Sequence, residues 1–265
     1  MYLPLYATLY GGPAKRLGLD ITLRFAGNDD AVFKQVASNR ADFGIGDPSF
    51  ALSDKKHGVS CVAILVKRAG IWGVTHNPAI PQLESMSDFV QLRIGSFPKP
   101  STTYELIAGL KRKHKRLLKN MQIVEAPIGA QAMLLTNNKA DVILELEPMV
   151  SLAEAQGLRA VFAIAPHYGD VAFTGLMASK RMQDAHPALV DKMQRAIQQG
   201  IHICNHDKVT SLRIAAKIFP NYPESVLENA YARLLHEQVW PETGAPDEKL
   251  LKAMKRLRIA SEKTR

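Results

Sequence analysis

The pattern of hydrophobic and polar positions changes character along the chain. Up to about residue 179, short apolar runs alternate with segments whose apolar residues recur every three or four positions. Apolar runs bounded by turn residues are typical of buried strands, and the longer period is typical of amphipathic helices. From about residue 184 the pattern is almost entirely helical. The sequence therefore predicts an α/β protein in which strands and helices alternate, followed by a helical C-terminal region.

The pattern can be divided into individual elements. Predicted strands cover residues 20–25, 41–46, 59–74, 92–97, 121–127, 140–146, 158–165 and 171–179. Predicted helices cover residues 28–39, 48–58, 98–110, 129–138, 148–157, 186–206, 208–219, 223–239 and 246–263. Because strands alternate with single helices, we expect mostly parallel sheets flanked by helices.

One strand-to-helix motif occurs twice. RADFGIGDPSFAL (40–52) is followed later by a looser copy, KADVILELEPMVSL (139–152). In each copy an apolar strand ends in an acidic residue and Pro, at Asp47-Pro48 and Glu147-Pro148. An acidic residue before Pro is typical of a helix N-terminus. Since ligands bind outside the carboxyl ends of such strands, the two copies predict two α/β lobes with a cleft between their edges.

The order of the elements predicts how the lobes share the chain. Residues 76–165 read as a self-contained α/β unit, and the C-terminal helices need the first lobe to pack against. We therefore expect residues 1–75 and 170–265 to form a discontinuous lobe 1, and residues 76–169 to form lobe 2. The hinges are expected near 72–77 and 165–172.

Composition and charge narrow the function classes. The chain has 265 residues and a formal net charge of +9, but the charge is scattered, and we predict no nucleic-acid partner. The densest run, KRKHKR (111–116), reads as a solvated helix end whose cations suit the helix dipole. Cys61 and Cys204 have no Cys or His neighbours at metal-ligand spacing, so we expect no metal site. Buried free thiols are the simpler interpretation, and the sequence leaves a disulfide open.

The ordered set of motifs resembles the type II periplasmic binding protein superfamily. The matching segments are residues 3–49 (LPLYATLY through GIGDPS), RIGSFPKPSTTYEL, ADVILELEPMVSLAEAQG and YGDVAFTGLMASK. Within the superfamily, the chain is most similar to the substrate-binding proteins of ABC transporters for nitrate, sulfonates, taurine and thiamine-pyrimidine precursors.

The resemblance implies a monomer without a cofactor that binds a small solute between two closing lobes. It also implies delivery of the solute to a membrane permease, and a periplasmic or cell-envelope location. Members of this group carry a signal peptide or lipid anchor and begin with a strand before the segment that matches residues 3–6. The chain shows neither feature, so we expect it to be truncated at its N-terminus.

The predicted helix start at PSTTYEL (100–106) is the strongest candidate for an anion site. Ser101, Thr102, Thr103 and Tyr104 would offer hydroxyl donors beside free backbone amides and the positive end of the helix dipole. The alternative is plain capping of the helix by Ser101 or Thr102, with Glu105 completing a capping box.

The other candidate residues lie at the first lobe's edge and near the predicted hinges. Asp47 and Glu147 could each cap a helix or bind a solute amine, and two inward carboxylates would favour a nitrogen-bearing solute such as an aminopyrimidine. The remaining candidates are a serine at the same edge, aromatic residues that could contact a ring, and an acidic residue at the second hinge: Ser49, Tyr6, Trp72, Tyr168 and Asp170.

The sequence favours a solute-binding protein over an enzyme, because hinge closure needs neither a nucleophile nor a metal. One alternative is an enzyme of the same fold, either a thiamine-pyrimidine synthase or a lyase. The synthases that the chain resembles rely on a cysteine-rich motif that it does not contain, and a lyase would have to use Asp47, Glu147 or Asp170 as its acid or base. A second alternative is the effector-sensing domain of a regulator.

Overall fold

The structure is a computed structural model that describes residues 2–54 and 56–262. It divides into two compact units. Unit 1 runs up to Ala69 and resumes over Asp170–Arg256, and unit 2 comprises Gly70–Gly169 with the end of the last helix from Leu257. The chain therefore leaves unit 1 after Ala69, returns to it at Asp170, and passes into unit 2 a second time near the end of its last helix.

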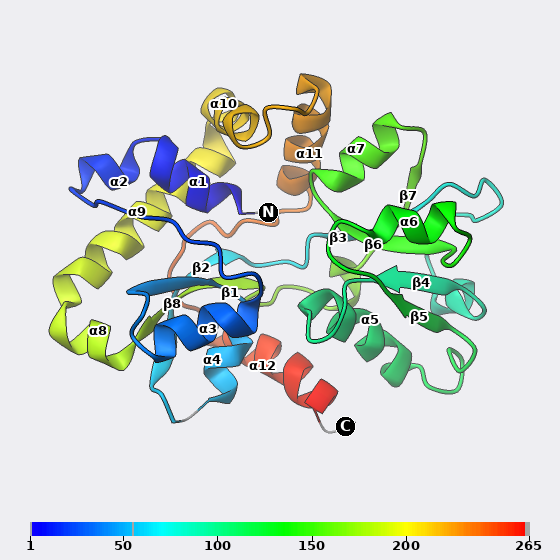
Figure 1. Cartoon of the computed structure of the whole chain (residues 1–265), viewed down its shortest axis with the longest axis horizontal. Coiled ribbons are helices and arrows are strands. Elements are labelled where there is room, and N and C mark those ends of the chain that lie inside the picture. The colour runs from blue at the N-terminus through cyan, green and yellow to red at the C-terminus, as the bar shows by residue number, and fades with distance from the viewer. Residues whose placement is uncertain (1, 55, 263–265) are drawn as a thin grey trace. The chain divides into compact units, whose positions relative to one another are not determined.

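In the part of unit 1 that the structure describes there are three strands and most of the helices of the chain (Figure 1). Its strands are β1 (Phe43–Gly46), β2 (Val59–Val66) and β8 (Thr174–Ser179). Its helices are α1 (Leu3–Tyr10), α2 (Pro13–Arg16), α3 (Asp29–Ala37), α4 (Ser49–Ser53), α8 (Lys180–Ala185), α9 (Pro187–His206), α10 (Lys208–Ile218), α11 (Glu224–His236) and α12 (Glu248–Glu262), which continues into unit 2. The predicted C-terminal helices are thus present. Lys55 in predicted helix 48–58 and Lys263 in predicted helix 246–263 lie outside the described residues.

The sheet of unit 1 has the order β1-β8-β2, and β8 runs antiparallel to both neighbours. The expectation of mostly parallel pairing is therefore wrong for this sheet. β1 and β2 are joined through α4 and run in the same direction, as the alternation predicts. β8 follows directly on the segment around Gly169–Asp170 that returns the chain from unit 2 (the second connecting segment; the first lies around Ala69–Gly70). Because no crossover helix precedes β8, nothing requires it to run parallel to its neighbours.

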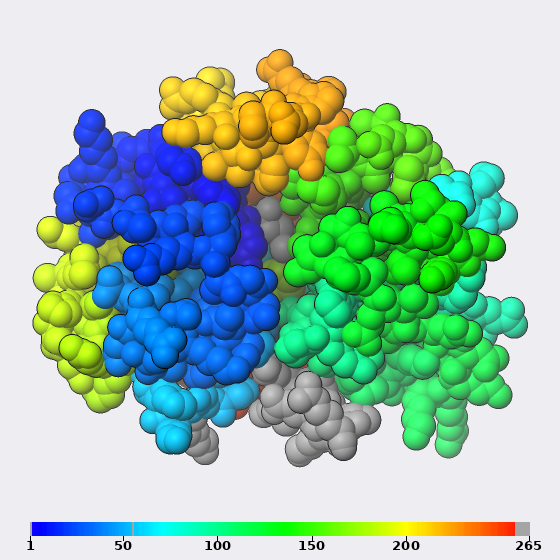
Figure 2. All heavy atoms as spheres, viewed as in Figure 1, coloured from blue at the N-terminus to red at the C-terminus, as the bar shows by residue number. Residues whose placement is uncertain are grey.

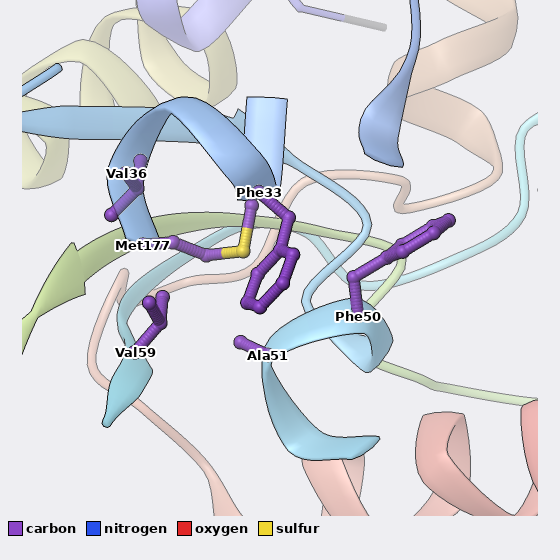
Figure 3. Close-up of a cluster of buried hydrophobic side chains, with 6 residues drawn as sticks. All are labelled: Phe33, Val36, Phe50, Ala51, Val59 and Met177. Atoms are coloured by element: carbon purple, nitrogen blue, oxygen red, sulfur yellow. The ribbon is translucent and has the colours of Figure 1, made fainter. Parts of the chain in front are cut away.

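A compact apolar cluster holds α3 and α4 against this sheet (Figure 3). Phe33 and Val36 come from α3, Phe50 and Ala51 from α4, and Val59 and Met177 from β2 and β8. The capping of α3 agrees with the sequence, because the Asn28 side chain accepts a hydrogen bond from the Ala31 amide at 2.8 Å. Local capping and the apolar face of α3 together fix the helix on the sheet.

The other helices of unit 1 form a second layer. α1 packs closely along α9, where the Thr8 hydroxyl lies between the Pro4 and Ala196 carbonyls and is within hydrogen-bond distance of both. α10 packs against α11, and the outer side chains of these two helices adjoin on the surface (Figure 2). None of the helices in the described ranges combines the length and apolarity that a bilayer span requires.

Unit 2 is built on a five-stranded sheet with the order β5-β4-β6-β3-β7. Its strands are β3 (Ile71–Thr75), β4 (Arg93–Ser96), β5 (Gln122–Glu125), β6 (Val142–Leu146) and β7 (Arg159–Ala163), and its helices are α5 (Thr102–Lys113), α6 (Gln131–Thr136) and α7 (Met149–Ala155), with short 3-10 turns at Met86–Phe89 and Ala165–His167. β4 pairs in parallel with β5 and β6, as expected. β3 is antiparallel to β6 and β7, because it enters directly from the first connecting segment.

The predicted strand 59–74 is two strands that lie in different sheets. β2 ends at Val66, and β3 begins at Ile71 after the polar pair Lys67-Arg68 and Gly70. Residues 71–75 are buried, and β3 lies inside the second sheet between β6 and β7. The first passage between the units therefore lies at Ala69–Gly70, and β3 was wrongly assigned to lobe 1.

Predicted strand 20–25 is not a strand in the structure. The segment has no regular secondary structure, and several of its side chains are exposed, including Phe25 at 84% of its maximum. A strand needs a neighbouring strand to satisfy its backbone groups, and none is paired with this segment among the described residues.

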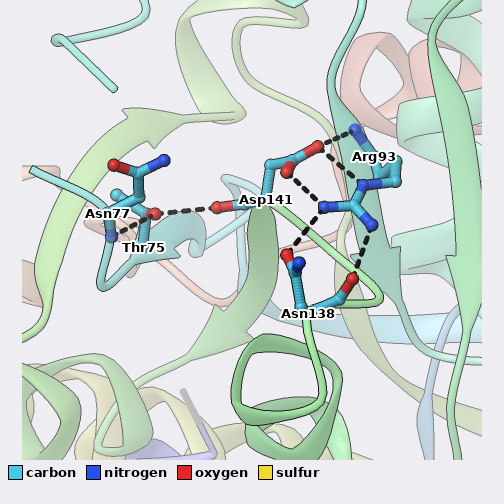
Figure 4. Close-up of polar contacts among 5 residues, drawn as sticks. All are labelled: Thr75, Asn77, Arg93, Asn138 and Asp141. Carbon is cyan, nitrogen blue, oxygen red and sulfur yellow. Dashed lines mark hydrogen bonds and ion pairs between the residues drawn. The ribbon is translucent and has the colours of Figure 1, made fainter. Parts of the chain in front are cut away.

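Asp141, in the second copy of the repeated motif, has a structural role at the end of the sheet where β4 and β6 begin (Figure 4). Its carboxylate accepts hydrogen bonds from the Arg93 amide at 2.7 Å and from the Arg93 guanidinium at 2.7 and 3.1 Å. The same guanidinium donates to Asn138, and the Thr75 hydroxyl donates to the Asp141 carbonyl. The hydrogen bonds from Arg93 lower the pKa of the Asp141 carboxyl.

We expect Asp141→Asn to lower the free energy of unfolding by about 1 kcal/mol at pH 7, because an amide cannot accept both guanidinium bonds as a charged partner. Because its pKa is lowered in the folded protein, the Asp141 carboxyl contributes stability above its unfolded-state pKa, and this contribution is lost as the pH falls through the folded-state pKa. The stability difference between wild type and Asp141→Asn should therefore shrink towards pH 3. Urea unfolding at the two pH values measures it. Asp184→Asn, which breaks an exposed pair with Lys180, is the control and should change little.

Candidate functional site

The carboxyl ends of the parallel strands in unit 2 meet at one edge of its sheet. β4, β5 and β6 end there, and the antiparallel β3 begins there, since Ile71 pairs with Leu146. α5 and α7 follow directly on β4 and β6, so their N-termini lie at the same edge. This is where an α/β sheet binds ligands.

The N-terminus of α5 is capped as the sequence allowed. The Ser101 hydroxyl accepts a hydrogen bond from the Tyr104 amide at 3.2 Å, so this hydroxyl serves the helix itself. Thr103 is buried at 4% exposure, and the Lys99 ammonium lies 4.6 Å from the centre of the Tyr104 ring. The positive helix end and this lysine make the local field favourable to an anion. Binding of a solute anion by Ser101, Thr102, Thr103 and Tyr104 remains a prediction.

Ser96 is not among the site residues that the sequence predicts. It is the last residue of β4, it is fully buried, and its hydroxyl has no hydrogen-bond partner among residues 2–54 and 56–262. A buried hydroxyl without a partner is costly and needs an explanation. Its sequence signal is a polar residue closing an apolar strand just before the hydroxyl-rich helix start, in LRIGSFPKPSTT.

Glu147 directly follows β6, and its carboxylate caps the N-terminus of α7. One carboxylate oxygen accepts the Ser151 hydroxyl at 2.9 Å, and the other accepts the Ser151 amide at 3.1 Å. Both residues are buried, at 5% and 1% exposure. The helix-cap interpretation is thus realised for Glu147, and a contact with solute remains a prediction.

Glu145, two residues earlier on β6, was also missed. It lies directly opposite Trp72 of β3 in the sheet register, so the two side chains share one face of the sheet. Burial raises the pKa of the Glu145 carboxyl to about 7, and a hydrogen bond from the Leu146 amide offsets this only in part. Trp72 is itself buried at 5% exposure.

Unit 1 presents a comparable edge, where β1 and β2 end and β8 begins. Asp47 follows β1, is buried at 4% exposure, and accepts the Ser49 amide at 2.8 Å. Asp29, at the start of α3, accepts the Asp47 amide at 3.0 Å. The helix-cap interpretation therefore holds for Asp47 as well, with the fully buried Ser49 beside it.

Tyr2 completes this edge and was not predicted. Although its ring is 38% exposed, burial of its hydroxyl raises its pKa, and the nearby Asp29 and Asp47 carboxylates add to the rise. Thr174, the first residue of β8, forms a side-chain hydrogen bond with the hydroxyl. Tyr6, the predicted aromatic, stacks on Tyr10 with ring centres 6.3 Å apart and lies one helical turn from Tyr2.

The two remaining candidates, Tyr168 and Asp170, lie on the second connecting segment and bind it to neighbouring parts of the chain. The Tyr168 hydroxyl donates to the Leu106 carbonyl of α5, and burial raises its pKa. Asp170 pairs with the Arg68 guanidinium and, at 3.3 Å, with the Lys67 ammonium. Burial acts to raise the pKa of Asp170, but these two cations outweigh it and the pKa is lowered. Asp170 thus ties the two connecting segments together at the unit 1 side.

The cysteines and the acidic groups offer no metal centre. Cys61 and Cys204 are buried free thiols, and burial raises the pKa of Cys61 to about 12. Within residues 2–54 and 56–262, no group of three or more His, Cys, Asp or Glu side chains is placed to hold a metal ion.

Comparison with known proteins defines the class. The chain matches the family described as NMT1/THI5 like over residues 2–208, which is more than half of its length. The chain therefore belongs to the NMT1/THI5-like family. No curated protein sequence matches it.

Three solved structures show the same fold at low sequence identity. The aliphatic sulphonate binding protein SsuA of Escherichia coli has a TM-score of 0.79 and 13% identity, over 99% of this chain and 89% of that one. The alkanesulfonate-binding SsuA of Xanthomonas axonopodis pv. citri, bound to MOPS, has a TM-score of 0.73 and 16% identity, over 94% and 85%. A Candida albicans protein described as defining a new family with the generic periplasmic binding protein fold has a TM-score of 0.71 and 13% identity, over 98% and 87%. The periplasmic binding protein fold is thereby confirmed.

Proposed function

We propose that the chain is the solute-binding component of an ABC importer and is not an enzyme. It would bind a small organic or anionic solute, with each unit contributing one sheet edge, and deliver it to a membrane permease. In this proposal the protein is a monomer that works in the periplasm or cell envelope. Family membership and the fold support the general role.

One observation about the chain path carries the proposal furthest. In unit 1 the connecting segments start where β2 ends and return where β8 begins, and both points lie at the candidate edge. In unit 2 they meet the sheet where β3 begins and β7 ends, again at the candidate edge, with the Ile164 amide donating to the Ile71 carbonyl at 3.0 Å. These two connecting segments therefore each run from one candidate edge to the other, and such connectivity suits closure about a paired hinge.

The first test is a thermal-shift screen against sulfonates, nitrate, bicarbonate and aminopyrimidines. A solute at 100 times its dissociation constant adds about 2.7 kcal/mol, which should raise the unfolding midpoint by about 5 to 10 °C in a chain of this size. Small-angle X-ray scattering with the active solute should show a smaller radius of gyration. If a solute binds but is chemically converted, the enzyme alternative replaces this proposal.

Ser96 provides a sharp test of the site in unit 2. We expect Ser96→Ala to leave stability unchanged or raise it by up to about 1 kcal/mol, because the hydroxyl that it removes is buried without a partner. If the hydroxyl is reserved for the solute, the same variant should weaken binding about tenfold. Calorimetric titration beside urea unfolding separates the two effects. Unchanged affinity would remove Ser96 from the site.

A further inference from the structure

We propose that Glu145 and Trp72 form a subsite in unit 2 for an amino or ammonium group of the bound solute. The inference rests on the proposed function and names the chemistry of the solute. It starts from the position of Glu145, the penultimate residue of β6, at the edge where the parallel strands end.

The first argument is the contrast between two carboxylates at the same strand end. Glu147 is satisfied by the amide and hydroxyl of Ser151. Among the residues that the structure describes, Glu145 forms no ion pair with a lysine, arginine or histidine. The Leu146 amide supplies a hydrogen bond, but the balance of burial and partners still disfavours the charged carboxylate.

The second argument is the cost of this arrangement. Ile143 and Leu144, the residues before Glu145 on β6, are fully buried aliphatic side chains. An apolar residue at position 145 would fit the same half-buried place without the penalty of desolvating a carboxylate. A carboxylate at a position where it destabilises the fold is characteristic of a functional site.

The third argument is the tryptophan opposite. Trp72 and Glu145 are directly paired across antiparallel strands, which places their Cβ atoms about 5 Å apart on one face of the sheet. An aromatic face attracts a cation, and a carboxylate accepts its N–H hydrogens. The two together select a compact nitrogen group over a hydroxyl or a methyl group in the same position.

Matched probes test the inference. Taurine and isethionate share a sulfonate and differ only by an ammonium in place of a hydroxyl, and 4-aminopyrimidine and pyrimidine differ by one amino group. We expect the protein to bind the nitrogen-bearing member of at least one pair tenfold or more tightly by calorimetric titration. Glu145→Gln should reduce that preference to threefold or less, and Glu84→Gln, an exposed glutamate of the same unit, should leave it intact.

The outcomes separate this inference from the proposed function. Equal binding of both members of each pair, or binding of plain sulfonates or nitrate alone, overturns the subsite and leaves the solute-binding role standing. A preference for the nitrogen group that survives in Glu145→Gln also overturns it. If no solute of the screen binds to the folded protein, both the subsite and the proposed function are contradicted.

Discussion

Replacing Gly200 with alanine is expected to lower the free energy of unfolding of unit 1 by about 2 to 3 kcal/mol. Gly200 lies on α9 where α1 crosses it, and a Cβ there would fall well inside 3.0 Å of the Thr8 hydroxyl and of the Pro4 carbonyl oxygen. The carbonyl is backbone and cannot rotate away, so α1 must move off α9. The better helix propensity of alanine recovers only about 1 kcal/mol.

Because each unit contains one of the two tryptophans of the chain, the unfolding of unit 1 can be measured separately from that of unit 2. Trp240 lies in unit 1 and Trp72 in unit 2. In a Trp72→Phe background, the fluorescence of Trp240 during urea unfolding should report the loss for Gly200→Ala. Lys192→Ala, on the exposed face of the same helix, should change stability by less than about 0.5 kcal/mol. A shift for Gly200→Ala no larger than this control would show that α1 and α9 are not held together through this contact.

The repeated motif shows what local sequence patterns can predict. A strand, an acidic residue and Pro predicted two helix starts at equivalent sheet edges, and both are present. The same acidic residues cap those starts, because short-range geometry sets how a carboxylate meets the amides of the following turn. The anion-site candidate at Ser101 was likewise placed at a helix N-terminus and a sheet edge.

Features that depend on contacts between distant parts of the chain could not be predicted from the sequence, for identifiable reasons. The direction of β3 and β8 depends on where the connecting segments enter each sheet, and an apolar strand reads the same in either direction. The run 59–74 gave no sign of a break other than Lys67, Arg68 and Gly70. Ser96 and Glu145 are single polar residues within apolar strands. Only the three-dimensional environment shows that, in the described part of the chain, the Ser96 hydroxyl has no hydrogen-bond partner and Glu145 forms no ion pair with a cation.

The hinge expectation changes with the structure and stays a prediction. Residues 72–75 belong to β3, a buried strand paired on both sides, so we now expect the rotation that the sequence predicts near 72–77 to fall on residues 67–70. The second expected hinge, 165–172, contains the passage at Gly169–Asp170. The pairing of Asp170 with Lys67 and Arg68 would make the two connecting segments move together.

In the absence of solute, Glu145→Gln is expected to stabilise the protein at pH 8 by about 2 to 3 kcal/mol and to have little effect at pH 4.5. The folded-state pKa of about 7 exceeds 4.5, the ordinary value for a glutamate carboxyl, which applies to the unfolded chain. Well below pH 4.5 the carboxyl is protonated in both states and has no effect on stability, and at pH 4.5, where it is half ionised in the unfolded chain, it lowers the stability by only about 0.4 kcal/mol. As the pH rises towards 7, the unfolded chain releases the proton before the folded protein does, so stability falls, and the loss is complete above the folded-state pKa.

The difference between wild type and Glu145→Gln isolates this carboxyl, because every other titrating group is common to both proteins. Urea unfolding at pH 4.5, 6, 7 and 8 should give two stability curves that separate steadily between pH 5 and 8. Glu84→Gln should run parallel to wild type throughout, since Glu84 is exposed. Curves for Glu145→Gln that also stay parallel would mean that the carboxylate is solvated or already has a cation as partner. The structural basis for the amino-group subsite would then be lost, whatever the protein binds.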